Sequence, residues 1–197
     1  MTSDTGSTDT GVLESLAACQ CGFVTVRQAE ALGFGQSMLV ELTESGSWTC
    51  DRRGLFRWAR VRRTELDDFA KWCTWFGGTA TVSHYSAADL HGLGHLGPRF
   101  VHLSVATAVP SPARQVALHR SPLGQGEFEQ IGPIRITTPL RTVHDLAAGG
   151  ISQELLNEVV ADGVAIGRLD THEIRASCAS ACHEVAVRVE SALAAAG

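Results

Sequence analysis

Residues 23–58 constrain the fold most, because two helix patterns and a hairpin pattern follow one another there without a long linker. Thr25 and Gln28 have capping-box spacing, in which a hydroxyl and an amide satisfy backbone donors at the start of a helix. Gly33 can adopt the left-handed backbone that ends such a helix. These residues predict a short helix followed by a tight turn.

A second helix is predicted over residues 36–45, where apolar side chains recur on one face and Gly46 marks the end. Apolar and polar residues then alternate on both sides of a turn-like segment, residues 51–54, which predicts a two-stranded ribbon. Together with a first helix near Leu13, this is the layout of a winged helix-turn-helix. We place that domain at residues 11–63.

Residues 64–197 predict a second domain of mixed α+β structure, so the whole chain is expected to be α+β. The boundary is placed near Arg63, where a basic strand gives way to a helix that Thr64 can cap. After that helix, alternating segments separated by prolines and glycines predict a small sheet. Pro139 stands in the first turn of a predicted helix, and the chain is expected to stay helical from there to its C-terminus.

The distribution of charge points to a polyanion-binding surface. The net charge is -5, which argues against a generic nucleic-acid binder. Residues 1–50 hold one arginine and six acidic residues, whereas residues 51–63 hold six arginines and one aspartate. Such a patch creates a local field that attracts phosphates even on an acidic molecule. A run of arginines is also compatible with a merely solvated face, and that interpretation stays open.

The second helix of the pair would be the recognition helix, which enters the major groove of DNA. At its start, the Gln36 amide can bond to an adenine edge and Ser37 to a base or a phosphate. Arginines of the ribbon can pair with phosphates through two hydrogen bonds each. The predicted contacts to double-stranded DNA are Gln36, Ser37, Arg52, Arg53, Arg57, Arg60, Arg62 and Arg63. Because Glu41 and Glu44 on the same helix would repel phosphates, the alternative is a protein-interaction module that has lost DNA readout.

Other functional classes find little support in the sequence. No apolar run approaches the roughly 20 residues that cross a bilayer, so no membrane contact is expected. Residues 1–10 lack the features of a signal peptide and predict a disordered tail. We therefore expect a cytoplasmic protein whose six cysteines are reduced.

Catalytic and metal-binding patterns are incomplete. His84, His91 and His95 invite a metal site, as do Cys178, Cys182 and His183. Cys178 and Cys182 are one helical turn apart and could be two of four zinc ligands, but no Cys-x-x-Cys or paired His motif nearby supplies the other two. His144 and Asp145 are adjacent within a predicted helix and are interpreted as a polar pair on its surface or between helices. We predict no metal, no cofactor and no catalytic residues, and therefore no enzyme.

The chain resembles the AbiEi family, antitoxins of bacterial type IV toxin-antitoxin systems. The resemblance rests on the Gly-aromatic-Val-Thr opening at Gly22, the arginine-rich ribbon, and residues 82–87, 90–93 and 136–147. It spans roughly residues 11–193 in the same order. It implies an antitoxin that neutralises a nucleotidyltransferase-like toxin and represses its own operon by binding promoter DNA. Direct binding of the toxin and formation of a homodimer are left open.

Overall fold

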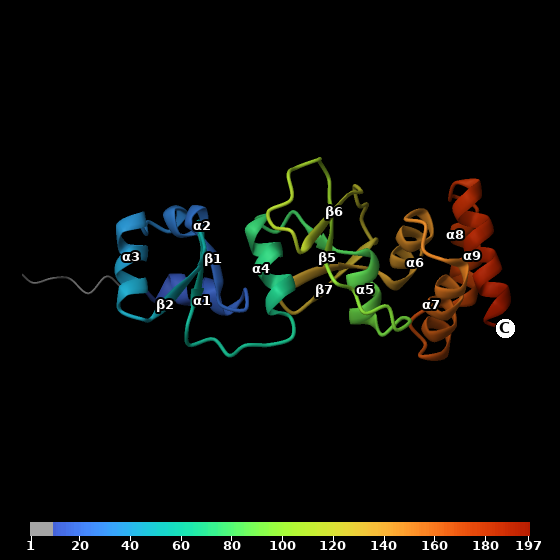
Figure 1. The fold of residues 1–197 in the computed structure, drawn as a ribbon, viewed down its shortest axis with the longest axis horizontal. Coiled ribbons are helices and arrows are strands. Elements are labelled where there is room, and N and C mark those ends of the chain that lie inside the picture. Colours follow the sequence, from blue (N-terminus) through green and yellow to red (C-terminus); the bar gives the residue numbers. More distant parts are fainter. Residues whose placement is uncertain (1–9) are drawn as a thin grey trace, which may run out of the picture. The chain divides into compact units, whose positions relative to one another are not determined.

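The computed structural model describes residues 10–197, and these form two compact units that divide after Gly78. The predicted tail of residues 1–10 lies, except for Thr10, outside the described residues. Both units combine helices with a sheet, so the predicted α+β class is confirmed (Figure 1). Among the described residues, no helix is long and apolar enough to cross a membrane.

The first unit consists of helices and a three-stranded antiparallel sheet. Its elements are α1 (Gly11–Ala18), β1 (Phe23–Thr25), α2 (Val26–Ala31), α3 (Gln36–Glu44), β2 (Trp48–Arg52), β3 (Leu55–Trp58) and α4 (Asp67–Trp75). The strand order is β1-β3-β2, so β2 and β3 form a hairpin in which β2 is the edge strand.

Local signals in the sequence explain where these elements start and stop. The predicted capping box at α2 is confirmed, because Thr25 Oγ1 accepts a hydrogen bond from Gln28 N and Gln28 Oε1 accepts one from Thr25 N. Gly54, with φ of 86°, forms the hairpin turn together with Arg53. A residue with a side chain rarely adopts such a φ, so glycine is needed there.

The core of the first unit lies between the sheet and the first three helices. Leu13 of α1, Leu39 of α3 and Trp48 of β2 are almost fully buried and belong to one apolar cluster with Val24 and Phe56. Burying a side chain of this size contributes about 1.5–3 kcal/mol each. This cluster therefore fixes α3 against the hairpin.

Helix α4 belongs to the first compact unit, which extends to Gly78, whereas the sequence placed a domain boundary near Arg63. Arg57 of β3 forms an ion pair with Asp67, the first residue of α4, with 3.1 Å between Nη2 and Oδ2. Asp51 of β2 pairs with Lys71 of α4 at 2.6 Å. Charge pairing between segments far apart in the chain fixes this helix on the hairpin, and a change of local composition cannot reveal such pairing.

The second unit, Thr79–Gly197, contains a five-stranded mixed sheet and a group of C-terminal helices. Its elements are β4 (Thr81–Val82), α5 (His84–His91), β5 (Val101–Val105), β6 (Val116–Arg120), β7 (Phe128–Ile131), β8 (Ile134–Thr137), α6 (Pro139–Ala148), α7 (Gln153–Ala165), α8 (Thr171–Cys178) and α9 (His183–Ala195). The strand order is β6-β5-β4-β8-β7. Strand β7 was not predicted, because its four residues show no clear alternation of apolar and polar side chains. Its extended backbone is instead stabilised by antiparallel pairing with β8.

Helices α6, α7, α8 and α9 lie together at the C-terminal end of the chain (Figure 1) and pack around their own apolar core. Leu146, Leu156 and Val189, from three of these helices, are almost fully buried in it. Helix α6 begins as predicted, with Thr138 Oγ1 accepting a hydrogen bond from Arg141 N and Pro139 in the first turn. This start places the polar side chains of α6 beside the loops around β7.

Candidate functional site

The outer face of α3 carries the residues that the sequence assigned to DNA. Gln36, Ser37, Glu41 and Glu44 are exposed, and Val40 is 46% exposed, whereas Leu39 on the opposite face is fully buried. Thr43 is half-buried and donates its hydroxyl to the Leu39 carbonyl. The helix therefore presents an amide and a hydroxyl at its start and two carboxylates further along.

Four of the six predicted arginines are exposed. They are Arg53, in the hairpin turn, and Arg60, Arg62 and Arg63, in the segment between β3 and α4. The side chain of Arg63 is 78% exposed, and its Nη1 lies 4.0 Å from Asp67 Oδ2. An ion pair this long and this exposed to water does not neutralise the charge of Arg63. These guanidinium groups remain available to an external polyanion.

Arg57, which the sequence assigned to DNA, is engaged within the first unit and is not exposed to an external ligand. Its side chain is only 6% exposed, is paired with Asp67, and donates a hydrogen bond to the Val61 carbonyl at 3.0 Å. Residues at the start of α4 cover the side of β3 on which Arg57 lies.

Arg52 is also engaged within the first unit. Its guanidinium carbon lies 4.3 Å from the ring centre of Trp75 and 5.2 Å from that of Trp72, both on α4. Such distances are those of cation–π contacts. The six predicted arginines therefore fall into three groups. Arg57 is buried in an ion pair, Arg52 lies against two tryptophans, and the other four are exposed.

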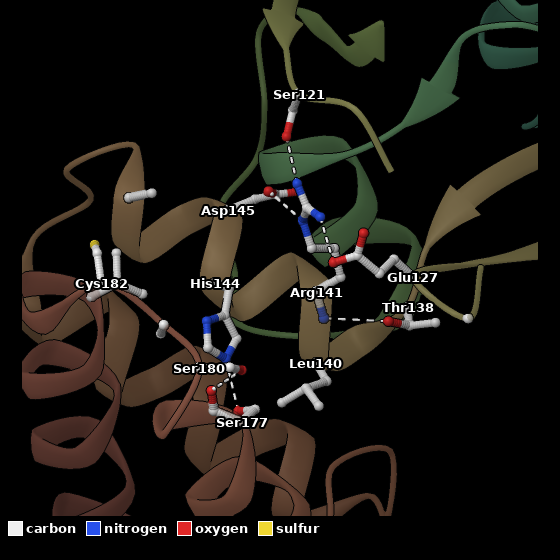
Figure 2. Close-up of a pocket in the computed structure, with 14 residues that line it drawn as sticks. Ser121, Glu127, Thr138, Leu140, Arg141, His144, Asp145, Ser177, Ser180 and Cys182 are labelled. Carbon is white, nitrogen blue, oxygen red and sulfur yellow. Dashed lines mark hydrogen bonds and ion pairs between the residues drawn. The ribbon is translucent and has the colours of Figure 1, made fainter. Parts of the chain in front are cut away.

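A pocket of about 450 Å³ lies in the second unit, within the size range of small-molecule sites (Figure 2). Helix α6 forms one wall, and the end of α8 and the start of α9 form another. Leu140 and Val185 provide apolar surface, whereas Arg141, His144 and Cys182 provide polar groups. No sequence pattern indicated this pocket, because its walls come from segments far apart in the chain.

Arg141 is held in the pocket by partners from three segments (Figure 2). Its guanidinium donates to Asp145 Oδ1 at 2.8 Å, to Glu127 Oε1 at 2.6 Å, and to Ser121 Oγ. Burial raises the pKa of Asp145, although the hydrogen bond from Arg141 opposes this change. Burial would also raise the pKa of Glu127, but hydrogen bonds from Gly124 and Arg141 bring it below its ordinary value. With two carboxylates around it, this guanidinium is poorly suited to capturing a further anion.

His144 links α6 to α8, as expected for a polar residue between helices. Its Nε2 lies 2.8 Å from Ser177 Oγ, and the Ser177 hydroxyl itself donates to the Ile174 carbonyl. The Ser177 oxygen therefore accepts from His144, which fixes the proton of a neutral imidazole on Nε2. Burial, assisted by the charge of Arg141, lowers the pKa of His144, so the neutral form dominates at pH 7.

A second polar cluster in this unit consists of three stacked histidines. The rings of His84 and His119 are 3.5 Å apart, and His102 Nδ1 lies 2.9 Å from His119 Nε2. Burial lowers the pKa of His84 to about 3 and that of His102 to about 4, with nearby histidines acting in the same direction. His102 and His119 were not singled out from the sequence, because only the parallel pairing of β5 with β6 brings them together.

The residues weighed as metal ligands are not assembled into a site. His91 bonds to the Thr137 carbonyl at 2.7 Å, and His95 is exposed. Cys178 is buried and Cys182 is exposed. Over residues 10–197, no group of three or more histidine, cysteine, aspartate or glutamate side chains is placed to hold a metal ion.

Comparisons with known proteins give similarity of structure but not of sequence. No protein-family model matches the sequence, and no curated protein matches it. The fold is similar to that in the crystal structure of RV2827C protein from Mycobacterium tuberculosis, with a TM-score of 0.62 and 15% sequence identity. The similarity covers 94% of this chain and 76% of that one. At this level of identity the likeness concerns the fold alone.

Proposed function

We propose that the first unit is a winged helix-turn-helix that binds double-stranded DNA, and that the chain is a type IV antitoxin that represses its own operon. The element order α1-β1-α2-α3-β2-β3 and the strand order β1-β3-β2 support this assignment. In this arrangement α3 is the recognition helix and the β2–β3 hairpin is the wing.

The observation that carries the DNA-binding proposal is the group of four exposed arginines at and after the hairpin. Arg53, Arg60, Arg62 and Arg63 concentrate positive charge on a chain whose net charge is -5. Contacts to phosphates provide most of the affinity of a DNA-binding protein and position it on the duplex. Gln36 and Ser37 at the exposed start of α3 then supply the groups that contact base edges.

DNA binding is tested by fluorescence anisotropy with the duplex upstream of the gene and a scrambled duplex of equal length. We expect the upstream duplex to bind with a Kd of about 10⁻⁸ M or tighter at physiological salt. Replacing Arg60, Arg62 and Arg63 by glutamine should flatten the plot of log K against log salt by about three units, near 0.9 for each lost phosphate contact. An unchanged slope would remove these arginines from the interface.

The antitoxin part of the proposal rests on the resemblance to the AbiEi family. Residues 82–87 and 136–147 carry that resemblance within the second unit. The direct test is co-expression with the adjacent open reading frame, which we expect to encode a nucleotidyltransferase-like toxin. Growth should be restored by the full chain, and it should remain arrested with a matched chain that ends at Gly78. Whether the toxin is bound directly is measured by pull-down in the same cells.

The alternative function is a protein-interaction module, and the exposed acidic residues of α3 favour it. Glu41 and Glu44 face outward next to Val40, a combination better suited to a protein surface than to a phosphate wall. Replacing both glutamates by glutamine separates the two functions. If α3 enters the groove, the loss of repulsion raises DNA affinity; if DNA affinity does not change, α3 does not lie against DNA.

A further inference from the structure

The tip of the β2–β3 hairpin is attached to α4 by the side chain of Arg52. Its guanidinium lies over two indole rings, 4.3 Å from the ring centre of Trp75 and 5.2 Å from that of Trp72. Trp72 is 2% exposed and Arg52 is half-buried. Partial removal from water strengthens a cation–π contact. Arg52 is therefore directed into its own unit rather than toward a ligand.

The residue before Arg52 is attached to the same helix. Asp51 pairs with Lys71 at 2.6 Å, and the side chains of the two residues are 27% and 17% exposed. Lys71 Nζ also lies 5.0 Å from the ring centre of Trp72. Two consecutive residues of β2 thus contact three residues of α4, so the hairpin tip and the helix form a single packed cluster.

A second attachment lies at the other end of α4. Asp67, its first residue, accepts a hydrogen bond from Arg57 of β3 and another from the Thr64 backbone amide. Trp75, the last residue of the helix, contacts Arg52 at the hairpin tip. The nine residues of α4 span about 13 Å at 1.5 Å each, so its first residue can contact β3 while its last residue contacts the hairpin tip.

The hairpin needs this support at its tip. Within residues 10–197, strand β2 is an edge strand whose one strand partner is β3, and its register shifts between Cys50 and Arg52. An edge strand with an interrupted ladder is held by few backbone hydrogen bonds. Strand β3 is held on its other side by β1, and the Gly54 carbonyl accepts a hydrogen bond from the Val26 amide at 3.0 Å, so it is the β2 side of the tip that depends on side-chain contacts. Arg53, by contrast, is exposed in the turn next to Gly54.

We propose that α4 anchors the hairpin tip, and that Arg52 is a positioning residue that directs the neighbouring Arg53 to the phosphates of bound DNA. The inference rests on the proposed DNA-binding function of the first unit. It assigns two adjacent arginines different roles, which a pair of matched variants, Arg52→Gln and Arg53→Gln, can separate. Each variant removes one positive charge, so the overall electrostatic change is the same.

The first measurement is amide hydrogen exchange of the hairpin in the full chain without DNA. Arg52→Gln should increase the exchange rate of the amides of residues 49–57 by about three- to thirtyfold, because the cation–π contact that closes the tip is lost. Arg53→Gln should leave these rates unchanged. Exchange in Arg52→Gln that matches the wild type would overturn the anchoring role.

The second measurement is the salt dependence of DNA binding. Arg53→Gln should flatten the slope by about one unit, as expected for one lost phosphate contact. Arg52→Gln should weaken binding while leaving the slope near that of the wild type. If Arg52→Gln flattens the slope as much as Arg53→Gln does, Arg52 is itself a phosphate contact and the positioning role is refuted.

A third variant, Trp75→Ala, removes the ring beneath Arg52 without changing any charge. It should reproduce the faster hairpin exchange and weaker binding of Arg52→Gln, again with an unchanged slope. Thermal unfolding shows whether Trp75→Ala still folds. If it does not, the positioning role is judged from Arg52→Gln alone. If the wild-type chain binds no duplex at any salt concentration, the proposed function fails together with the positioning role. Hydrogen exchange then still decides whether α4 anchors the hairpin.

Discussion

Replacing Arg57 by methionine should strongly destabilise the first unit. The substitution keeps an apolar chain in place but leaves the Asp67 carboxylate, whose side chain is 11% exposed, without its buried cation. Breaking one partner of a buried ion pair costs about 3–5 kcal/mol. The only other cation near Asp67 among the described residues is Arg63, which is 4.0 Å away and too exposed to compensate.

The double variant Arg57→Met, Asp67→Leu should recover much of this loss. Replacing a buried pair by apolar residues is often neutral, since both desolvation costs disappear. Arg57 Nε is buried without a hydrogen-bond partner in the described structure, so the native pair is not fully satisfied. Asp67 also accepts two hydrogen bonds from Thr64, and their loss should leave a deficit of about 1–2 kcal/mol.

Urea unfolding followed by tryptophan fluorescence measures both effects. All four tryptophans of the chain, at positions 48, 58, 72 and 75, lie in the first unit, so the signal reports that unit alone. A loss below about 1 kcal/mol for Arg57→Met would be typical of a surface ion pair and would refute the buried arrangement. Additive losses in the double variant would show that the two side chains do not interact.

Three further predictions concern the second unit. Because burial lowers the pKa of His84 and His102 in the folded state, unfolding takes up protons below about pH 6.5. Stability should therefore be constant above about pH 7 and fall as the pH approaches 4, with a slope of up to about 1.4 kcal/mol per pH unit for each histidine, measured by thermal unfolding. The variant His84→Gln should show a smaller slope, because one of the two histidines that take up a proton on unfolding is removed. A stability profile that is flat between pH 7 and 5 would contradict the burial of these histidines. Gly163→Ala should cost about 1–3 kcal/mol in chemical unfolding, because its Cβ would lie 2.3 Å from Leu169 Cδ1; a neutral result would mean that the helix shifts freely. Arg141→Ala should cost about 3–5 kcal/mol in the same assay by leaving a buried carboxylate unpaired, and Arg141→Lys should recover only part of this because lysine cannot reproduce the three-way contact.

Much of the local structure could be predicted from the sequence. The capping box at Thr25, the proline in the first turn of α6 and the glycine of the hairpin turn act over two to four residues, and each marks an element boundary correctly. The exposed face of α3 also followed from its apolar periodicity. The candidate DNA contacts were less predictable, because an arginine in a strand has the same local pattern whether its face is covered or open.

The sequence by itself determined the order of the helices and the hairpin in the first unit, the start of α6 and the concentration of arginines in residues 51–63, but it did not indicate strand β7. Only the tertiary structure decided which of those arginines face solvent, because α4 packs on the hairpin and engages Arg52 and Arg57. It also decided that His102 approaches His119 and that Arg141 bonds to Glu127. The physical reason is range: backbone preferences act between near neighbours, whereas burial and ion pairing depend on surfaces that meet only after the chain has folded.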